Sequence, residues 1–265
     1  MDYEKELSVA MELARKAGKL IMESKKNEAS INEKDDGTKV TSIDIKSEEL
    51  IIEGIKKNFP NDGIVSEESA KIRSLREWHI DPLDGTGSFL FGSDEFTVNI
   101  GLCENGVPVL GIVIRPATGE LYLGVKDKGA YKINSSGQKH SLSVQDNGGS
   151  DMCAVIAYNE KASSKNEIIL KAAGIKKSIK IAGAGLRIIS IADNKADIFV
   201  TPLLDSKTWD LCGPQIILEE AGGCMQYING KKIDYDDIIN FPNYIIAAKS
   251  IAQMKLMQKK LSGSL

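Results

Sequence analysis

The sequence predicts a layered protein of helices and strands, with a β-rich first half and an alternating α/β second half. Residues 96–125 contain three strand-like runs separated by turn residues, which is typical of an antiparallel meander. Beyond residue 150, apolar runs alternate with helical segments, which favours an α/β unit. We therefore expect two domains, residues 1–145 and 146–265, that divide in a stretch rich in Ser, Gly and Gln.

Two amphipathic helices and a short strand open the chain. Apolar residues at helical spacing predict helices over residues 4–26 and 42–57. Thr41 and Asp44 fit a capping box at the start of the second helix, which is a purely structural explanation for the acid. The short apolar strand that follows ends in Glu67 and Glu68, and such a pair is usually part of a solvated loop.

The second half contains the remaining expected elements. Strands are expected at residues 154–157, 178–182, 197–200 and 244–248, and helices at 164–173, 184–192, 208–221 and 251–261.

Among the patterns in the sequence, the one at residues 78–89 is the most informative about a possible reaction. Asp81 and Asp84 lie three apart, and Pro82 favours extended backbone at Asp81. Asp84 and Gly85 then turn the chain, and Thr86 can cap a short helix. Carboxylates bind Mg²⁺ and helix N-termini bind phosphate, so the pattern indicates metal-dependent chemistry on a phosphate ester. An Asp-rich turn followed by a capped helix is the alternative.

Two later positions extend this hypothesis. Asp210 opens a helix, where an acid complements the helix dipole without any further role. As a ligand it would join Glu67, Asp81 and Asp84 to give the carboxylate count of a two-metal site.

A Gly-Ala-Gly-Leu-Arg segment at residues 183–187 links a predicted strand to a helix. The segment lacks the third glycine of a dinucleotide fingerprint, so a tight strand–helix turn is an equal alternative. Arg187 can face solvent or bind an anionic group of a substrate.

Composition and charge exclude several classes of protein. The chain has 265 residues and a net charge of −3, so it lacks the basic surface that a nucleic-acid polymer requires. No apolar run has the length of a membrane span, and the polar N-terminus differs from a signal peptide. The four cysteines lack metal-type spacing and predict reduced thiols in a cytoplasmic protein. His79 and His140, the two histidines, also lack such spacing.

Four segments together resemble one family. Residues 78–86 resemble the first signature of the inositol monophosphatase superfamily of Mg²⁺-dependent, lithium-sensitive phosphatases, and residues 209–223 resemble the second. Residues 40–44 and 67–69 are similar to two further stretches of that family, in the same order. The resemblance implies an αβαβα layered sandwich with an α+β half and an α/β half.

The resemblance also implies roles for individual residues. Asp44 and Thr86 would polarise the attacking water, and the backbone amides of Gly85 and Thr86 would bind the phosphate. Two or three Mg²⁺ ions would be held by oxygen ligands, with Asp210 also near the substrate: Glu67, Asp81, Asp84, Asp210 and the carbonyl of Leu83.

The choice of branch rests on fewer residues. Residues 94–100, 108–111, 183–187 and 207–214 are similar to the 3′-phosphoadenosine 5′-phosphate phosphatases, where Gly183 and Arg187 would contact the nucleotide. That branch usually has lysine in place of this arginine, and a larger polar pair in place of Gly87 and Ser88. Residues 157–160 also lack its Ser and His.

Several alternatives therefore stay open. The expected partner is a small phosphate ester, most closely 3′-phosphoadenosine 5′-phosphate, with inositol 1-phosphate or fructose 1,6-bisphosphate as the alternatives. A non-catalytic regulator that binds metal or nucleotide is the alternative of another class. The resemblance is compatible with a monomer or a homodimer.

Overall fold

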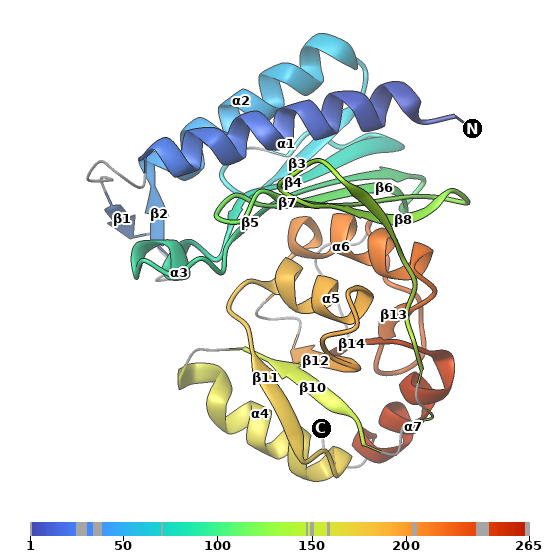
Figure 1. Cartoon of the computed structure of the whole chain (residues 1–265). Helices are drawn as coiled ribbons and strands as arrows, with labels where there is room; N and C mark the ends of the chain where they lie inside the picture. The colour runs from blue at the N-terminus through green and yellow to red at the C-terminus, as the bar shows by residue number, and fades with distance from the viewer. Residues whose placement is uncertain are drawn as a thin grey trace.

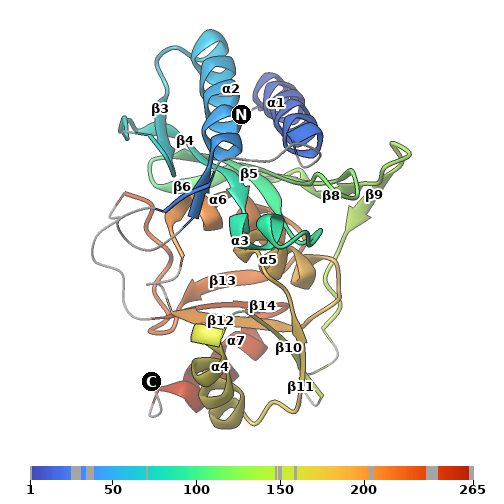
Figure 2. The same ribbon diagram turned by 90° about the vertical axis from the view of Figure 1, so that its left-hand side faces the viewer.

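The computed structural model stacks helices and sheets in five layers. It describes residues 2–24, 31–33, 39–69, 71–146, 148, 151–157, 160–202, 206–236 and 244–262. Helices α1 (Glu4–Ser24) and α2 (Ser42–Asn58) cover one face of a seven-stranded sheet, and α5 (Ala184–Ala192) and α6 (Thr208–Glu220) cover the other. A five-stranded sheet follows, with α4 (Glu160–Ala173) and α7 (Ile251–Leu261) outside it (Figures 1 and 2). The predicted αβαβα sandwich is confirmed.

The seven-stranded sheet contains the predicted meander. Its strands lie in chain order, and only the first pair is parallel. The sheet also includes a short strand within the stretch that we expected to be a linker. The strands are β3 (Gly63–Ser66), β4 (Arg76–Asp84), β5 (Thr97–Glu104), β6 (Val107–Arg115), β7 (Glu120–Val125), β8 (Gly129–Ile133) and β9 (Lys139–Leu142).

The five-stranded sheet has the order β11-β10-β12-β14-β13, and β10 pairs in parallel with both of its neighbours. Strand β13 was not predicted. The strands are β10 (Cys153–Ile156), β11 (Lys177–Lys180), β12 (Ile198–Pro202), β13 (Cys224–Tyr227) and β14 (Tyr244–Ala248). A small separate hairpin of β1 (Ile31–Glu33) and β2 (Lys39–Thr41) precedes α2, and the short α3 (Thr86–Leu90) follows β4.

Helix α6 packs directly against the backbone of the large sheet because three glycines are aligned across the sheet. Gly101, Gly111 and Gly124 are neighbours in the registers of β5, β6 and β7. A Cβ atom on Gly101 would lie 2.6 Å from the backbone N of Gly213, and one on Gly124 would lie 2.7 Å from the Cα of Ile217. Because the three glycines have no side chains, α6 can pack against the strand backbones, and this contact holds the start of the helix against the sheet.

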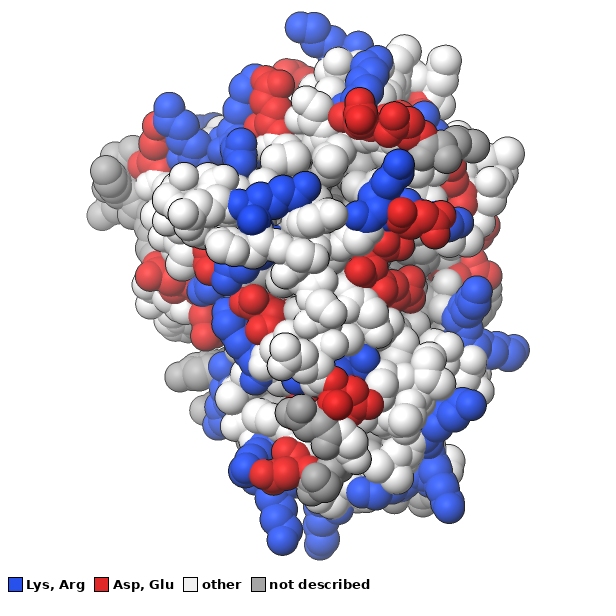
Figure 3. Space-filling model, turned by 45° about the vertical axis from the view of Figure 1, so that its right-hand side comes forward, with Lys and Arg blue, Asp and Glu red and all other residues white. Residues whose placement is uncertain are grey.

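Two further sequence-based predictions concern the domain division and membrane-spanning segments. The division of the chain into two domains near residue 145 stays a prediction. Among the described residues, none of the helices combines the length and apolar character that a membrane crossing requires. Basic and acidic side chains are interspersed on the face shown in Figure 3.

Candidate metal centre

The ends of two parallel strands bring the first two acids together. Strand β3 pairs with β4 so that Ser66 lies opposite Ile80, and Glu67 and Asp81 follow directly at the same edge. Asp81 is 1% exposed. Burial, followed by the charges of Glu67, Asp84 and Asp210, raises the pKa of Asp81 well above its usual value. The four predicted carboxylate ligands therefore lie in one electrostatically coupled cluster.

Asp210 joins the cluster from the first turn of α6. Its Oδ2 atom accepts a hydrogen bond of 2.6 Å from the backbone N of Lys207, so the acid also completes a cap at the helix start. Burial and the charge of Asp84 raise the pKa of Asp210 to about 6, although the Lys207 amide, Asp81 and Arg187 act in the opposite direction. The capping role and the position in the cluster are thus compatible.

This charge pattern fits divalent cations. Burial and mutual repulsion raise the pKa values of Asp81 and Asp210, because the negative charges of the cluster lie close together. Hard oxygen donors are the ligands that Mg²⁺ prefers, and its charge would offset the repulsion. The residues present therefore suit the predicted ion.

Asp84 connects the two halves of the molecule. Its Oδ1 and Oδ2 atoms accept hydrogen bonds from the backbone N atoms of Ala184 (3.0 Å) and Gly185 (2.7 Å) at the start of α5. A Cβ atom on Gly183 would lie 2.8 Å from Asp84 Oδ2, so only glycine fits there without displacing the carboxylate. The turn at residues 183–185 therefore has the structural role that the sequence analysis gave as an alternative. Its backbone amides hold the Asp84 carboxylate of the candidate centre in place.

Asp44 and Thr86, the two residues with an implied role in activating water, are in direct contact. Asp44 is fully buried, and its Oδ1 atom lies 3.0 Å from the Thr86 hydroxyl, which also lies 3.0 Å from the carbonyl oxygen of Leu83. The other carboxylate oxygen, Oδ2, accepts a 2.8 Å hydrogen bond from the backbone N of Thr41. The capping box at α2 is therefore real, and it orients Asp44 toward Thr86.

The prediction that Thr86 caps the short helix α3 is wrong. The N-cap is Gly85, and no side chain caps this helix. The Thr86 hydroxyl is directed to Asp44 and Leu83 instead. Gly85 has φ of 87°, and a Cβ there would lie 2.9 Å from the carbonyl oxygen of Glu95, so both conformation and space require glycine. The binding of phosphate by these amides stays a prediction.

Arg187 stabilises the segment before α5. It is 7% exposed, its Nη1 atom donates a 2.9 Å hydrogen bond to the carbonyl of Ala182, and its guanidinium lies over the ring of Phe199. Its charge also reaches the acidic cluster, because it lowers the pKa of Asp210. Its predicted contact with a nucleotide stays a prediction, and Tyr158 and Asn159, which bear on the same contact, lie outside the described residues.

Sequence reasoning missed Glu48. This α2 residue is 2% exposed and accepts hydrogen bonds from the Ser66 and Ser69 hydroxyls and from the backbone N of Glu68 (2.8 Å). Glu48 thereby shapes the loop that carries Glu67. A signal was present, since Glu48 occupies the buried face of α2 one turn after Asp44.

Comparisons with known proteins agree with this geometry. The model of the inositol monophosphatase family matches residues 2–262. A histidinol-phosphatase of Chlorobaculum parvum is 32% identical over 250 residues, with 90% of this chain and 92% of the relative covered. The 3′(2′),5′-bisphosphate nucleotidase CysQ of Buchnera aphidicola is 32% identical over 241 residues, with 88% of each chain covered.

A solved structure has the same fold. The extragenic suppressor protein SuhB of Bartonella henselae superposes with a TM-score of 0.85 at 23% identity, covering 99% of this chain and 100% of that one. The family match spans nearly the whole chain and includes all four motif segments. These two relatives are named as a phosphatase and a nucleotidase, and with the family match they support a phosphomonoesterase. This chain belongs to the inositol monophosphatase family of Mg²⁺-dependent phosphatases.

Proposed function

We propose that the protein hydrolyses 3′-phosphoadenosine 5′-phosphate to AMP by Mg²⁺-dependent attack of water on the 3′-phosphate. The observation that carries the proposal is the carboxylate cluster with the Asp44–Thr86 pair beside it. A module that only binds metal or nucleotide would need the first feature but not the second. The kinship with CysQ nucleotidases supports the choice of substrate.

The proposed ligands come from four separate segments. Glu67, Asp81, Asp84 and Asp210, with the carbonyl of Leu83, would hold two or three Mg²⁺ ions. The ions would supply Lewis acidity, which lowers the pKa of water and offsets the charge of the phosphate. Asp84 is held by the Ala184 and Gly185 amides, and Asp210 by the Lys207 amide, so these ligands are oriented before any ion binds.

Asp44 and Thr86 would orient the attacking water. The Thr41 amide holds Asp44, and Asp44 in turn receives the hydroxyl hydrogen of Thr86. The lone pairs of Thr86 Oγ1 are then available to accept a hydrogen from water, and the proton can pass on to Asp44 Oδ1. The first-turn amides at Gly85 and Thr86 would hold the phosphate oxygens during attack.

Residues at the start of α5 are proposed to determine which substrate is bound. Gly183 would allow the nucleotide to approach the Asp84 carboxylate, and Arg187 would attract the second phosphate. Inositol 1-phosphate and fructose 1,6-bisphosphate lack the base but present a similar ester, so they are the alternative substrates.

The test is phosphate release with Mg²⁺ from 3′-phosphoadenosine 5′-phosphate, inositol 1-phosphate, fructose 1,6-bisphosphate and histidinol phosphate. We expect the nucleotide to have the highest kcat/KM, and Asp81→Asn to abolish turnover while leaving the fold intact. Preference for another ester would refute the nucleotide assignment alone. If no ester is hydrolysed, the chain is a non-catalytic regulator, and near-normal turnover of Asp81→Asn would refute the proposed centre.

A further inference from the structure

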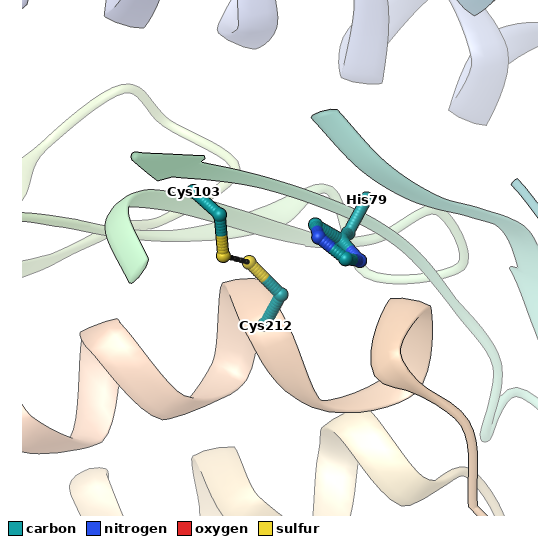
Figure 4. Close-up of side chains that lie close together, drawn as sticks. All are labelled: His79, Cys103 and Cys212. Carbon is teal, nitrogen blue, oxygen red and sulfur yellow. Dashed lines mark hydrogen bonds between the residues drawn. The ribbon is translucent and has the colours of Figure 1, made fainter. Parts of the chain in front are cut away.

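Two thiols that the proposed reaction does not use face each other between β5 and α6. Cys103 and Cys212 are 109 residues apart in sequence, yet their Sγ atoms lie 3.4 Å apart and both residues are fully buried. Figure 4 shows the sulfur atoms directed at one another from the strand and the helix, with His79 of β4 beside them. A disulfide has an S–S length of about 2.05 Å, so the two sulfur atoms must approach each other by about 1.4 Å to form one.

We propose that Cys103 and Cys212 are a modification site that closes to a disulfide on exposure to a peroxide, and that closure weakens metal binding at Asp210. One sulfur attacks a peroxide oxygen, so that an S–O bond forms, the O–O bond breaks and water leaves. The second sulfur then attacks the sulfenic sulfur, the S–O bond breaks, and hydroxide leaves with the thiol proton as water. Two thiols lose two electrons in total, and one peroxide gains them.

The other cysteines lack this arrangement. All four cysteines are free thiols. The Sγ atom of Cys153 lies 3.8 Å from the carbonyl of Ala154, and that of Cys224 lies 3.7 Å from the carbonyl of Ala248, whereas Cys103 and Cys212 contact each other. A sulfenic acid at Cys103 or Cys212 would therefore meet a thiol at once, which favours the disulfide over further oxidation.

A thiophilic metal is the competing occupant of this place. His79, Cys103 and Cys212 offer three possible ligand atoms within 4.8 Å of one another. However, His79 Nδ1 lies 3.0 Å from the Thr208 hydroxyl, and Nε2 lies 3.2 Å from Glu77 Oε1. Both ring nitrogens thus already have oxygen neighbours that a metal would have to displace, although the Cys103 thiol has His79 as a neighbour besides Cys212. The disulfide is the outcome that this geometry favours.

Closure has a consequence for the metal centre because Cys212 is two residues beyond Asp210 on α6. The helix cannot move straight toward β5, since Gly101 already leaves no space for a Cβ against Gly213. We therefore expect closure of the sulfur gap to rotate or slide the first turn of α6 and to move Asp210 with it. Mg²⁺ tolerates little departure from octahedral geometry, so its affinity should fall. This step rests on the proposed role of Asp210, whereas the disulfide does not.

The experiment treats the full-length protein with hydrogen peroxide and follows three readouts. Alkylation under denaturing conditions and peptide mapping should show two of the four thiols lost, a mass decrease of about 2 Da, and a Cys103–Cys212 cross-link. Phosphatase activity should fall about tenfold, with a higher Mg²⁺ requirement, and recover after reduction with dithiothreitol. Cys212→Ala and Cys103→Ala should resist peroxide, and Cys224→Ala, a matched buried control, should behave like the wild type.

The outcomes separate the two proposals. Three results would each refute the disulfide site: four alkylated thiols after peroxide treatment, oxidation of Cys153 alone, or Zn²⁺ bound to the cysteine pair by elemental analysis. These results come from the wild-type protein, so they remain valid even if a variant fails to fold. A cross-link that leaves Mg²⁺ binding by calorimetry unchanged would overturn the regulatory step. A cross-link that weakens Mg²⁺ binding in a protein without phosphatase activity would support this inference and refute the proposed function.

Discussion

Replacing Gly101 by alanine should weaken metal binding although the residue touches no carboxylate. The new Cβ would lie 2.6 Å from the backbone N of Gly213 and 2.8 Å from the Cβ of Cys212. Restoring the 3.4 Å of an ordinary contact requires the start of α6 to retreat by about 0.8 Å. Asp210 lies in that first turn and retreats with it. Overpacking of this kind costs about 1–3 kcal/mol of folding stability.

The effect on activity follows from the tolerance of the site. A misplacement of about 1 Å can cost roughly 100-fold in rate, so we expect a 10- to 100-fold loss of kcat/KM. The Mg²⁺ concentration for half-maximal activity should also rise, by about tenfold. Mg²⁺ titrations of phosphate release and urea unfolding measure the two effects separately.

Two matched alanine variants distinguish displacement of Asp210 from general destabilisation. Gly124→Ala creates a similar overlap, 2.7 Å from the Cα of Ile217, but it does so farther along α6. It should lose similar stability and keep most of its Mg²⁺ affinity. Gly18 lies within α1, and a Cβ atom there would have its nearest neighbours, atoms of Pro116, at an ordinary distance of 3.5 Å. Gly18→Ala should therefore stabilise the folded protein by about 0.5–1 kcal/mol. If Gly101→Ala is destabilised but keeps the wild-type Mg²⁺ requirement, the reasoning about α6 is wrong.

Three further predictions concern the site directly. Without Mg²⁺, Asp210 has a raised pKa of about 6, so the folded state binds a proton at this group more tightly than the unfolded state does. The folding stability therefore falls as the pH rises from about 4 to 6. Asp210→Asn should therefore stabilise the metal-free protein by roughly 1–3 kcal/mol at pH 7.5 and much less near pH 4, and thermal melts at the two pH values check this. Thr86→Val should lower kcat about 100-fold with little change in Mg²⁺ binding, whereas Thr86→Ser should keep most activity; equal losses in both variants would contradict a role for the hydroxyl. Glu48→Gln should raise the Mg²⁺ requirement several-fold by loosening the Glu67 loop, whereas the exposed neighbour variant Glu49→Gln should change nothing measurable.

Local patterns predicted most elements because their periodicity is strong. The helices and the meander were found from apolar spacing, whereas β13 was missed because its residues, Cys, Met, Gln and Tyr, contain no β-branched run. The stretch around β9 has the composition of a linker, and its residues Lys139–Leu142 are mostly exposed, so pairing with β8 determines the strand rather than any apolar pattern.

Single positions in the site could be named from the sequence, but their partners could not. Thr86 was expected to cap α3, yet its hydroxyl binds Asp44, which is 42 residues away. Asp84 is held by amides of α5 that are 100 and 101 residues away. Such contacts depend on how α2 and α5 pack around the end of β4, which no local spacing encodes. The family resemblance supplied the grouping of these residues, and the structure supplied the contacts that orient them.

The capping hydrogen bonds and the proposed metal roles are parts of one arrangement. Asp44 completes the capping box of α2, Asp84 accepts hydrogen bonds from the first amides of α5, and Asp210 completes the capping box of α6. A carboxylate held by a helix start keeps a fixed direction, and the positive end of the helix dipole stabilises its charged form. This partly offsets the repulsion within the cluster before any cation binds. The structural explanations that the sequence offered for these acids are therefore compatible with the proposed metal and catalytic roles, because the capping contacts fix the directions of the carboxylates.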